Sequence, residues 1–88
     1  MDEIQTLLSA ATYRIRDLRL SHKYTQKYVT EAINVSRITY VRYESEIRQM
    51  KTGELIALSR LYNVSTDYIL GLTNFDTPHF WQYMDFDR

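Results

Sequence analysis

Apolar residues recur along the first part of the chain at spacings of three and four. They lie at Ile4, Leu7, Leu8, Ala11, Ile15 and Leu18. This spacing is typical of an α-helix that buries one stripe of its surface. Because the stripe ends near Ser21, the pattern predicts a first helix from about Asp2. It can be continuous, or it can restart near Ser9 or Thr12.

A short second helix is predicted over residues 26–33. Thr25 is its N-cap candidate, because a threonine hydroxyl can accept a hydrogen bond from a free amide at a helix start. Asn34 tolerates the left-handed conformation that ends many helices, and Val35 can close the turn against the core. The side chains of this helix that we expect to face inward are Val29, Ala32 and Ile33.

Three further helices are predicted from the caps that follow. Ser36 is an N-cap candidate for a helix from Arg37 to about Ser45, and Thr52 for a fourth helix. Ser65 can cap a fifth helix, which Gly71 closes in a C′ position. The residues that we assign to the last two helices are Leu55, Ile56, Leu58, Ser59, Leu61, Tyr68, Ile69 and Leu70.

Composition favours a single all-α domain of 88 residues. Two glycines and one proline are few turn residues for a β-sandwich or barrel. The absence of cysteine excludes disulfides and thiolate chemistry and fits a cytoplasmic setting. An acidic start and the lack of an apolar run of about 18 residues argue against secretion and membrane insertion.

The formal net charge is zero, which taken alone disfavours a nucleic-acid partner. The distribution of charge changes this interpretation. Residues 11–51 hold nine Lys/Arg against four Asp/Glu, a local surplus of five, and the balancing acids lie towards the two ends. A basic central region is therefore available for a polyanion.

Residues 26–45 predict a helix, a tight turn and a second helix, an arrangement that can place the second helix in the DNA major groove. The sequence resembles the Cro/repressor-type (xenobiotic-response-element-like) helix-turn-helix family, in register over roughly residues 12–73. The matching segments are RIRDLR at 14–19, TQ at 25–26, NVSR at 34–37, RYE at 42–44 and LYNVSTDYILGLT at 61–73. The resemblance implies a compact five-helix, lambda-repressor-like DNA-binding domain over 1–73, with a recognition helix over 36–45.

The resemblance also implies roles for individual residues. Thr25 and Gln26 fall where the family caps the second helix and contacts a DNA phosphate. Arg19 and Glu44 fall where many members form a buried ion pair between the first helix and the recognition helix. The positions that meet base edges or the flanking backbone are Ser36, Arg37, Ile38, Thr39 and Arg42.

The chemistry of these side chains agrees with the implied roles. Arg37 and Arg42 can donate bidentately to guanine O6 and N7, whereas Ile38 can contact only a thymine methyl or a sugar. Arg48 and Lys51 are better placed for phosphates, which supply affinity without sequence information. Each arginine also has an alternative role without DNA. Arg37 can simply be solvated in the first turn of its helix, and Arg42 can pair with Glu46 one turn later.

Two tyrosines and three departures from the family pattern affect the details of docking. We expect Tyr43 in the core and Tyr40 at the rim of the DNA, as a phosphate contact. Lys23 and Asn34 stand where glycine is common, and asparagine adopts the required backbone more easily than lysine does. Glu46 adds a negative charge close to the expected phosphates.

No residues in the sequence point to catalysis or to a bound cofactor, metal or small-molecule ligand. His22 and His79 lie far apart and have no ligand spacing around them. The paired acids, Glu44 with Glu46 and Asp85 with Asp87, have no accompanying nucleophile or histidine base. We therefore expect a protein that is not an enzyme.

Residues 74–88 form an aromatic tail, in which Pro78 can start a last short helix. The tail can fold back on the first and fifth helices or pack against a second copy of the chain, and Trp and Phe are common interface anchors. We favour the homodimer because paired half-sites match a two-fold axis. The tail residues concerned are Phe75, Phe80, Trp81, Tyr83 and Phe86.

The sequence thus predicts a cytoplasmic, sequence-specific regulator that binds double-stranded DNA and represses transcription, from a bacterial or phage source. The alternative is a protein-interaction module, such as an antitoxin, that keeps the helix-turn-helix core and binds a partner through its helices and aromatic tail. Zero net charge and Glu46 favour this alternative.

Overall fold

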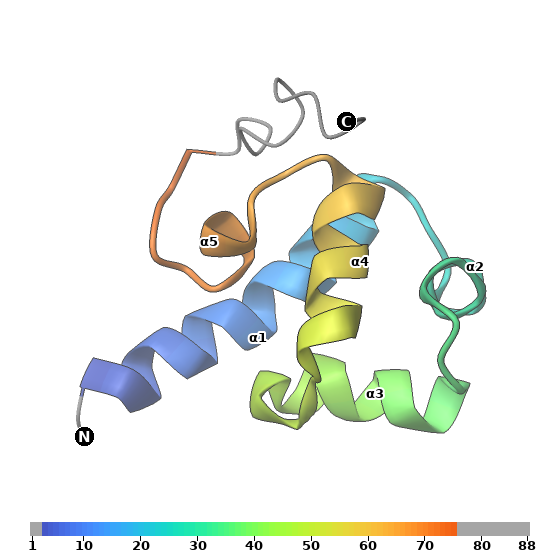
Figure 1. The fold of residues 1–88 in the computed structure, drawn as a ribbon, viewed down its shortest axis with the longest axis horizontal. Coiled ribbons are helices and arrows are strands. Elements are labelled where there is room, and N and C mark those ends of the chain that lie inside the picture. Colours follow the sequence, from blue (N-terminus) through green and yellow to red (C-terminus); the bar gives the residue numbers. More distant parts are fainter. Residues whose placement is uncertain (1–2, 76–88) are drawn as a thin grey trace, which may run out of the picture.

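A computed structural model describes residues 3–75, apart from the side chain of Arg48. The helices in this part of the chain are α1 (Glu3–Ser21), α2 (Gln26–Ile33), α3 (Arg37–Ser45), the 3-10 turn η1 (Ile47–Gln49), α4 (Thr52–Tyr62) and α5 (Thr66–Ile69), shown in Figure 1. These residues contain no strand, and the predicted all-α class is confirmed. None of the described helices has the length and apolarity that a membrane span requires.

Side-chain caps start three of the five α-helices in this region. Thr25 accepts a hydrogen bond from the Tyr28 amide at 3.0 Å, and Ser65 accepts one from the Tyr68 amide at 2.9 Å. Ser36 likewise caps α3, so all three predicted caps are confirmed. The cap predicted at Thr52 is wrong by one residue. Lys51 holds the extended N-cap conformation there, without a side-chain bond, and Thr52 is the first helical residue.

Left-handed backbone conformations follow α1, α2, α4 and α5, whereas α3 ends at Glu46 in an extended conformation. Asn34 has φ 60° and donates its amide to the Thr30 carbonyl, as expected for the end of α2. Lys23 also has φ 60° although it carries a Cβ, and Gly71 follows α5 at φ 80°. Asn34 and Lys23 therefore adopt, with a Cβ, a backbone conformation that glycine adopts most readily. Lys23 is the costlier of the two replacements because only asparagine and glycine adopt this region readily.

The core lies where α1, α3, α4 and α5 meet, with α2 packed against α3 and α4. Two sequence expectations fail at its edges. Ile4 remains 62% exposed because the first turn of α1 extends beyond the other helices (Figure 1). Ala32 is exposed, and Thr30 takes the buried position beside Val29 and Ile33.

Polar side chains connect segments that are distant in sequence. The Arg14 guanidinium donates to the Tyr68 carbonyl at 2.8 Å and the Thr73 carbonyl at 3.2 Å, and lies 4.1 Å from the centre of the Tyr68 ring. It thereby fastens the chain after α5 to the middle of α1. The Thr12 hydroxyl accepts the Ile47 amide at 3.0 Å and joins α1 to η1.

Candidate nucleic-acid interface

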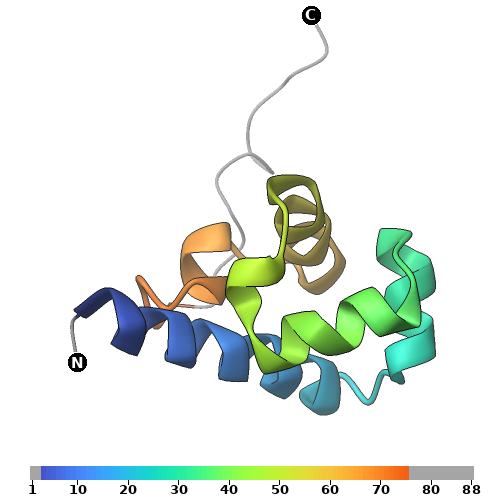
Figure 2. The same ribbon diagram turned by 90° about the horizontal axis from the view of Figure 1, so that it is seen from below.

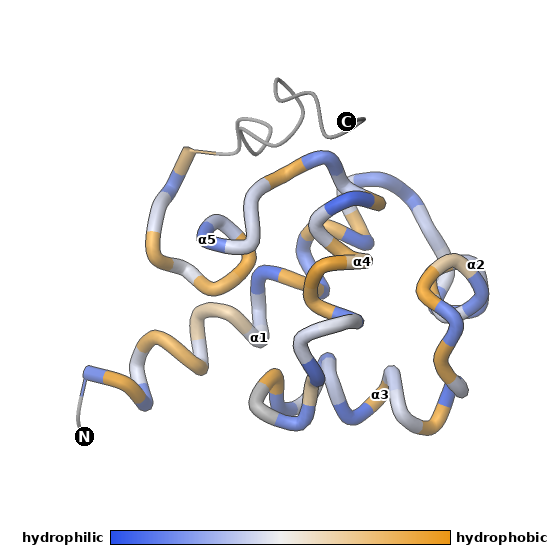
Figure 3. Tube along the Cα trace, in the orientation of Figure 1, coloured by the Kyte–Doolittle hydropathy of each residue, from blue (hydrophilic) through white to orange (hydrophobic). Residues whose placement is uncertain are grey.

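Helix α3 has one buried side and one open side. Tyr40 and Tyr43 are buried on the inner side. On the outer side Arg37 and Arg42 are exposed, and Ile38 is 72% exposed. Figure 1 shows α3 along the lower edge of the fold, and Figure 2, seen from below, shows it open to the viewer. Hydrophobic and hydrophilic residues follow one another along it (Figure 3).

An ion pair joins the inner side of α3 to α1. Arg19 Nε donates to Glu44 Oε2 at 2.6 Å, and Arg19 Nη2 donates to Glu44 Oε1 at 3.2 Å. The side chains are only 12% and 8% exposed, respectively. The ion pair implied by the family resemblance is therefore present, in the bidentate geometry that is strongest for arginine and carboxylate. Arg19 Nη1 also donates to the Tyr24 carbonyl at 3.1 Å and so reaches the turn before α2.

The electrostatics of this pair favour its ionised form. Burial alone would raise the pKa of the Glu44 carboxyl, but the hydrogen bonds from Arg19, together with the Tyr40 hydroxyl and Gln26, lower it below its ordinary value. The hydrogen bond to Glu44 raises the pKa of Arg19 against the opposing effect of burial. Both groups therefore stay charged near neutral pH, and α1 and α3 stay connected.

The structure corrects the expectation for Tyr40. Its side chain is completely buried, and burial raises the pKa of its phenol. Its hydroxyl lies close enough to Glu44 to lower the pKa of that carboxyl, but it makes no hydrogen bond of standard geometry. The Tyr62 hydroxyl is likewise buried without a hydrogen-bond partner. Tyr40 cannot contact a phosphate from this position. With Tyr43 one turn later on the same side, it packs in the core because residues at i and i+3 share a helix face.

The other residues expected at base edges lie on the open side of α3 or at its start. Ser36 is exposed and Thr39 is half-exposed. The Ser36 hydroxyl accepts the Thr39 amide at 3.1 Å and donates to the Thr39 hydroxyl at 2.9 Å. The structure thus brings Ser36, Thr39 and Arg37 together at the N-terminal end of α3.

The expected phosphate contacts differ in how they are held. Thr25 is exposed and caps α2. The side-chain amide of Gln26 donates to Glu44 Oε1 at 3.3 Å, so the ion pair also fixes the first residue of α2. Lys51 is exposed at the N-cap of α4. The side chain of Arg48 lies outside the described part of the structure.

Comparison with known proteins agrees with this geometry. The helix-turn-helix family model matches residues 15–69. The chain belongs to the helix-turn-helix family. The resemblance to Cro/repressor-type members, drawn from the sequence, is thereby confirmed.

Two curated relatives from Bacillus subtilis (strain 168) are similar to this helix-turn-helix chain. The uncharacterized HTH-type transcriptional regulator YobD is 43% identical over 65 residues, which are 74% of this chain and 58% of the relative. The HTH-type transcriptional regulator ImmR is 43% identical over 58 residues, which are 66% of this chain and 46% of the relative. The chain thus matches about half the length of each relative. No solved structure matches.

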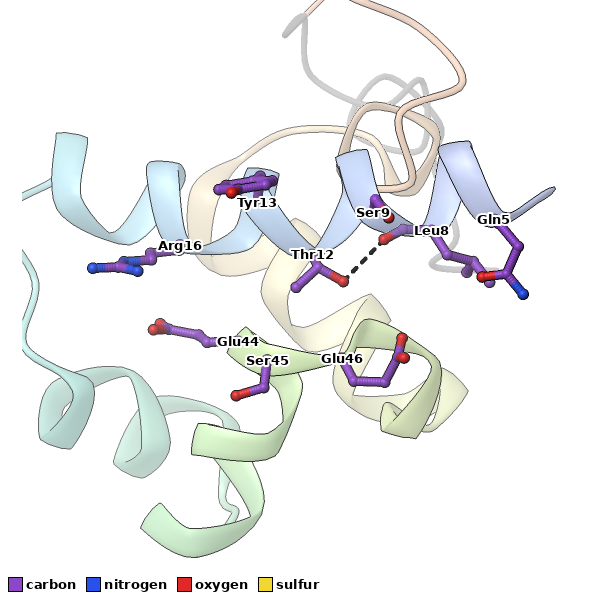
Figure 4. A pocket seen from close by; sticks show the side chains of 9 residues that line it. All are labelled: Gln5, Leu8, Ser9, Thr12, Tyr13, Arg16, Glu44, Ser45 and Glu46. Carbon is purple, nitrogen blue, oxygen red and sulfur yellow. Dashed lines mark hydrogen bonds between the residues drawn. The ribbon is translucent and has the colours of Figure 1, made fainter. Parts of the chain in front are cut away.

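A polar hollow of about 330 Å³ lies behind α3, between its C-terminal end and α1. In Figure 4 the side chains of α1 from Gln5 to Arg16 lie along one side, and Glu44, Ser45 and Glu46 lie along the other. Glu46 therefore lines the joint between two helices. It also lines a surface hollow with Val41 and Arg42, so its negative charge lies close to the C-terminal end of the open side of α3.

One feature of the helix-turn-helix site had no clear sequence signal. Val41 is 42% exposed on the open side of α3, although its apolar character suggested nothing about DNA. Phe75 is 75% exposed at the end of the described chain. The remaining aromatic tail residues, Phe80, Trp81, Tyr83 and Phe86, and the short helix expected after Pro78 lie outside the described residues.

Proposed function

We propose that this chain is a sequence-specific regulator that binds double-stranded DNA and represses transcription in the cytoplasm by occupying a promoter. The observation that carries the proposal is the two-sided construction of α3. Its open side presents Arg37 and Arg42 to solvent, while the Arg19–Glu44 pair holds the opposite side against α1. An exposed helix on a rigid support is what major-groove recognition requires.

The roles within the interface follow from hydrogen-bonding capacity. Arg37 and Arg42 are the residues that contact guanine O6 and N7, because a guanidinium donates in a fork that matches both acceptors. Ser36 and Thr39, at the start of α3, supply hydroxyls to neighbouring bases or backbone. Ile38 contacts a thymine methyl or a sugar.

Phosphate contacts come from Thr25, Gln26, Arg48 and Lys51, which precede and follow the recognition helix in sequence. Gln26 supports this assignment because Glu44 holds its amide in place at the start of α2. Lys51 supplies an exposed charge at the start of α4. Such contacts fix the register of the protein on the duplex and make its affinity depend on salt.

The regulator is proposed to act as a homodimer on paired half-sites. Apolar side chains remain exposed away from α3, at Ile4 (62%), Leu72 (59%) and Phe75 (75%). Such side chains are typical anchors of interfaces when they are gathered into one surface. The backbone of Gly71 passes close to α1, because a Cβ added there would lie 3.5 Å from the Ala10 Cβ. The aromatic tail would add to this surface.

Selection of binding sites from a randomised duplex pool at moderate salt tests the function. The parent protein should enrich one sequence arranged as an inverted repeat. Arg37→Ala should weaken binding to that sequence by about 1–3 kcal/mol and relax one base position per half-site. Arg60→Ala, which removes an exposed arginine from α4, is the matched control and should keep the affinity and the specificity.

The outcomes separate the proposal from its alternative. Loss of enrichment in the Arg37→Ala, Arg42→Ala double variant, with thermal unfolding unchanged, supports recognition by α3. Failure of the parent protein to enrich any duplex would contradict DNA recognition and favour a protein-interaction module. A reporter gene placed behind the selected site should show lower expression when the protein is present, and raised expression would contradict repression.

A further inference from the structure

The polar hollow between α1 and the C-terminal end of α3 plays no part in the proposed DNA contacts. Its volume of about 330 Å³ lies at the lower end of the range of small-molecule sites. Leu8 lies half-buried along it and packs against the core, while most of the other lining residues carry hydroxyl, amide or charged groups. The hollow therefore has the size and the mixed chemical character of a site for a small ligand.

The two ends of the hollow carry opposite charges. In Figure 4 the Arg16 guanidinium lies at one end and the Glu46 carboxylate at the other. Arg16 is exposed and forms no hydrogen bond or ion pair with another residue in the described part of the chain. Glu46 is half-buried at the end of α3, and a carboxylate can accept several hydrogen bonds at once.

The third charged residue of the lining, Glu44, is already neutralised. Arg19 donates to both of its carboxylate oxygens, at 2.6 and 3.2 Å, and Gln26 donates to Oε1 at 3.3 Å. The charges that remain for a ligand are therefore one cation, Arg16, and one anion, Glu46. A ligand with a single charge would leave one of these two residues unmatched, whereas a zwitterion matches both.

The length of the hollow decides which zwitterion fits. Glu46 lies across the hollow from Leu8 in Figure 4, and Leu8 and Arg16 are separated by about 12 Å along the axis of α1. A free amino acid carries its ammonium and carboxylate groups on one carbon atom and cannot reach both ends. An extended peptide of about three or four residues covers this length.

We propose that the hollow between α1 and α3 binds a short peptide with free termini, its amine at Glu46 and its carboxylate at Arg16. A guanidinium donates to a carboxylate in a bidentate, charge-assisted geometry, which makes Arg16 suited to the C-terminal end. The apolar side chain of Leu8 lies between the two charged ends and contacts the middle of the peptide. This site goes beyond the proposed function, because none of its contacts involves DNA.

Trialanine tests the inference, because it has the proposed length and both terminal charges. It is titrated into the full chain while the backbone amide shifts are followed by NMR. We expect saturable shifts at Thr12, Ser45 and Ile47, with a dissociation constant in the millimolar range. N-acetylated and C-amidated trialanine should each bind about tenfold more weakly, because each loses one charge-assisted contact.

Two substitutions assign each end of the peptide to one residue. Arg16→Gln should remove the preference for the free carboxylate over the amide and keep the preference for the free amine. Glu46→Gln should do the reverse. Arg60→Gln removes an exposed arginine of α4 that is outside the lining, so this control should keep both preferences.

The outcomes are separate from those of DNA selection. If no amide shift saturates with trialanine, or if acetylation and amidation leave the affinity unchanged, the peptide site is wrong and the proposed DNA-binding function is unaffected. If both end groups matter but neither substitution changes its own preference, the assignment to Arg16 and Glu46 is wrong.

Discussion

Arg19 in α1 and Glu44 in α3 are joined by two hydrogen bonds, at 2.6 and 3.2 Å, in a largely buried position. Glu44 also accepts a hydrogen bond from Gln26 at the start of α2. One carboxylate on α3 is therefore hydrogen-bonded to both α1 and α2, and so connects the two helices of the helix-turn-helix unit to the first helix. The proposed recognition by α3 depends on this ion pair, although neither member of the pair lies on the open side of the helix.

Replacing Glu44 with alanine should destabilise the protein by about 3 kcal/mol, because it leaves the Arg19 charge buried without its partner. Urea unfolding followed by circular dichroism measures the change. Glu31→Ala, which removes an exposed carboxylate from α2, is the control and should change stability by less than about 0.5 kcal/mol. Equal effects of the two substitutions would show that the buried pair contributes no more than a surface charge.

Acid should weaken the fold through the same carboxylate. The folded-state pKa of Glu44 lies below its ordinary value of 4.5, so its stabilising contribution is complete above the unfolded-state pKa and is lost as the pH falls through the folded-state pKa. Urea unfolding of the parent protein between pH 7 and about pH 3 should show this loss. Glu44→Gln should be less stable at neutral pH and should lose less stability over the same range. An identical pH dependence in both proteins would assign acid sensitivity to other groups.

Two tyrosine-to-phenylalanine substitutions should act in opposite directions. The Tyr62 hydroxyl is buried without a hydrogen-bond partner, so Tyr62→Phe should leave stability unchanged or raise it by up to about 1 kcal/mol. Tyr43 donates to Glu54 Oε1 at 3.1 Å and joins α3 to α4. Tyr43→Phe should therefore cost about 1 kcal/mol. Thermal unfolding shows which of the two variants is the more stable. If Tyr62→Phe were the less stable one, the Tyr62 hydroxyl of the parent protein would have a stabilising partner.

Lys23→Gly should stabilise the protein by roughly 0.5–1 kcal/mol, because Lys23 holds a left-handed conformation at φ 60° that glycine adopts without steric cost. The same substitution at Lys27, inside α2, should destabilise it by about 0.5 kcal/mol. The two unfolding midpoints should thus move in opposite directions. A loss of stability at both positions would mean that the Lys23 side chain contributes more than its backbone conformation costs.

The sequence was most informative where structure is decided locally. The hydroxyls of Thr25, Ser36 and Ser65 cap helices that begin immediately after them, and Asn34 and Gly71 end helices where their backbone preferences allow it. These features depend on neighbours within a few residues. The Arg19–Glu44 pair was expected from the family resemblance, because nothing in the local sequence connects two residues 25 positions apart.

The inner side of α3 shows why the rest could not be predicted. The apolar residues of α3 are Ile38, Tyr40, Val41 and Tyr43. They are distributed around the whole helix, so periodicity does not identify the buried side. Tyr40 was consequently assigned to the DNA rim and lies in the core. The contacts of Arg14 with residues 68 and 73 depend on the packing of α5 against α1, which only the assembled fold reveals.

The Arg14 contacts also determine where the described part of the chain ends. By holding the Tyr68 and Thr73 carbonyls, this side chain sets the departure point of the polypeptide on the far side of the molecule from α3, as the upper left of Figure 1 shows. A fluorophore, affinity handle or fused polypeptide attached at residue 75 would begin away from the proposed groove-binding surface. A label at this end of the domain would therefore report on the proposed dimer contact at Phe75 and not on the groove-binding surface.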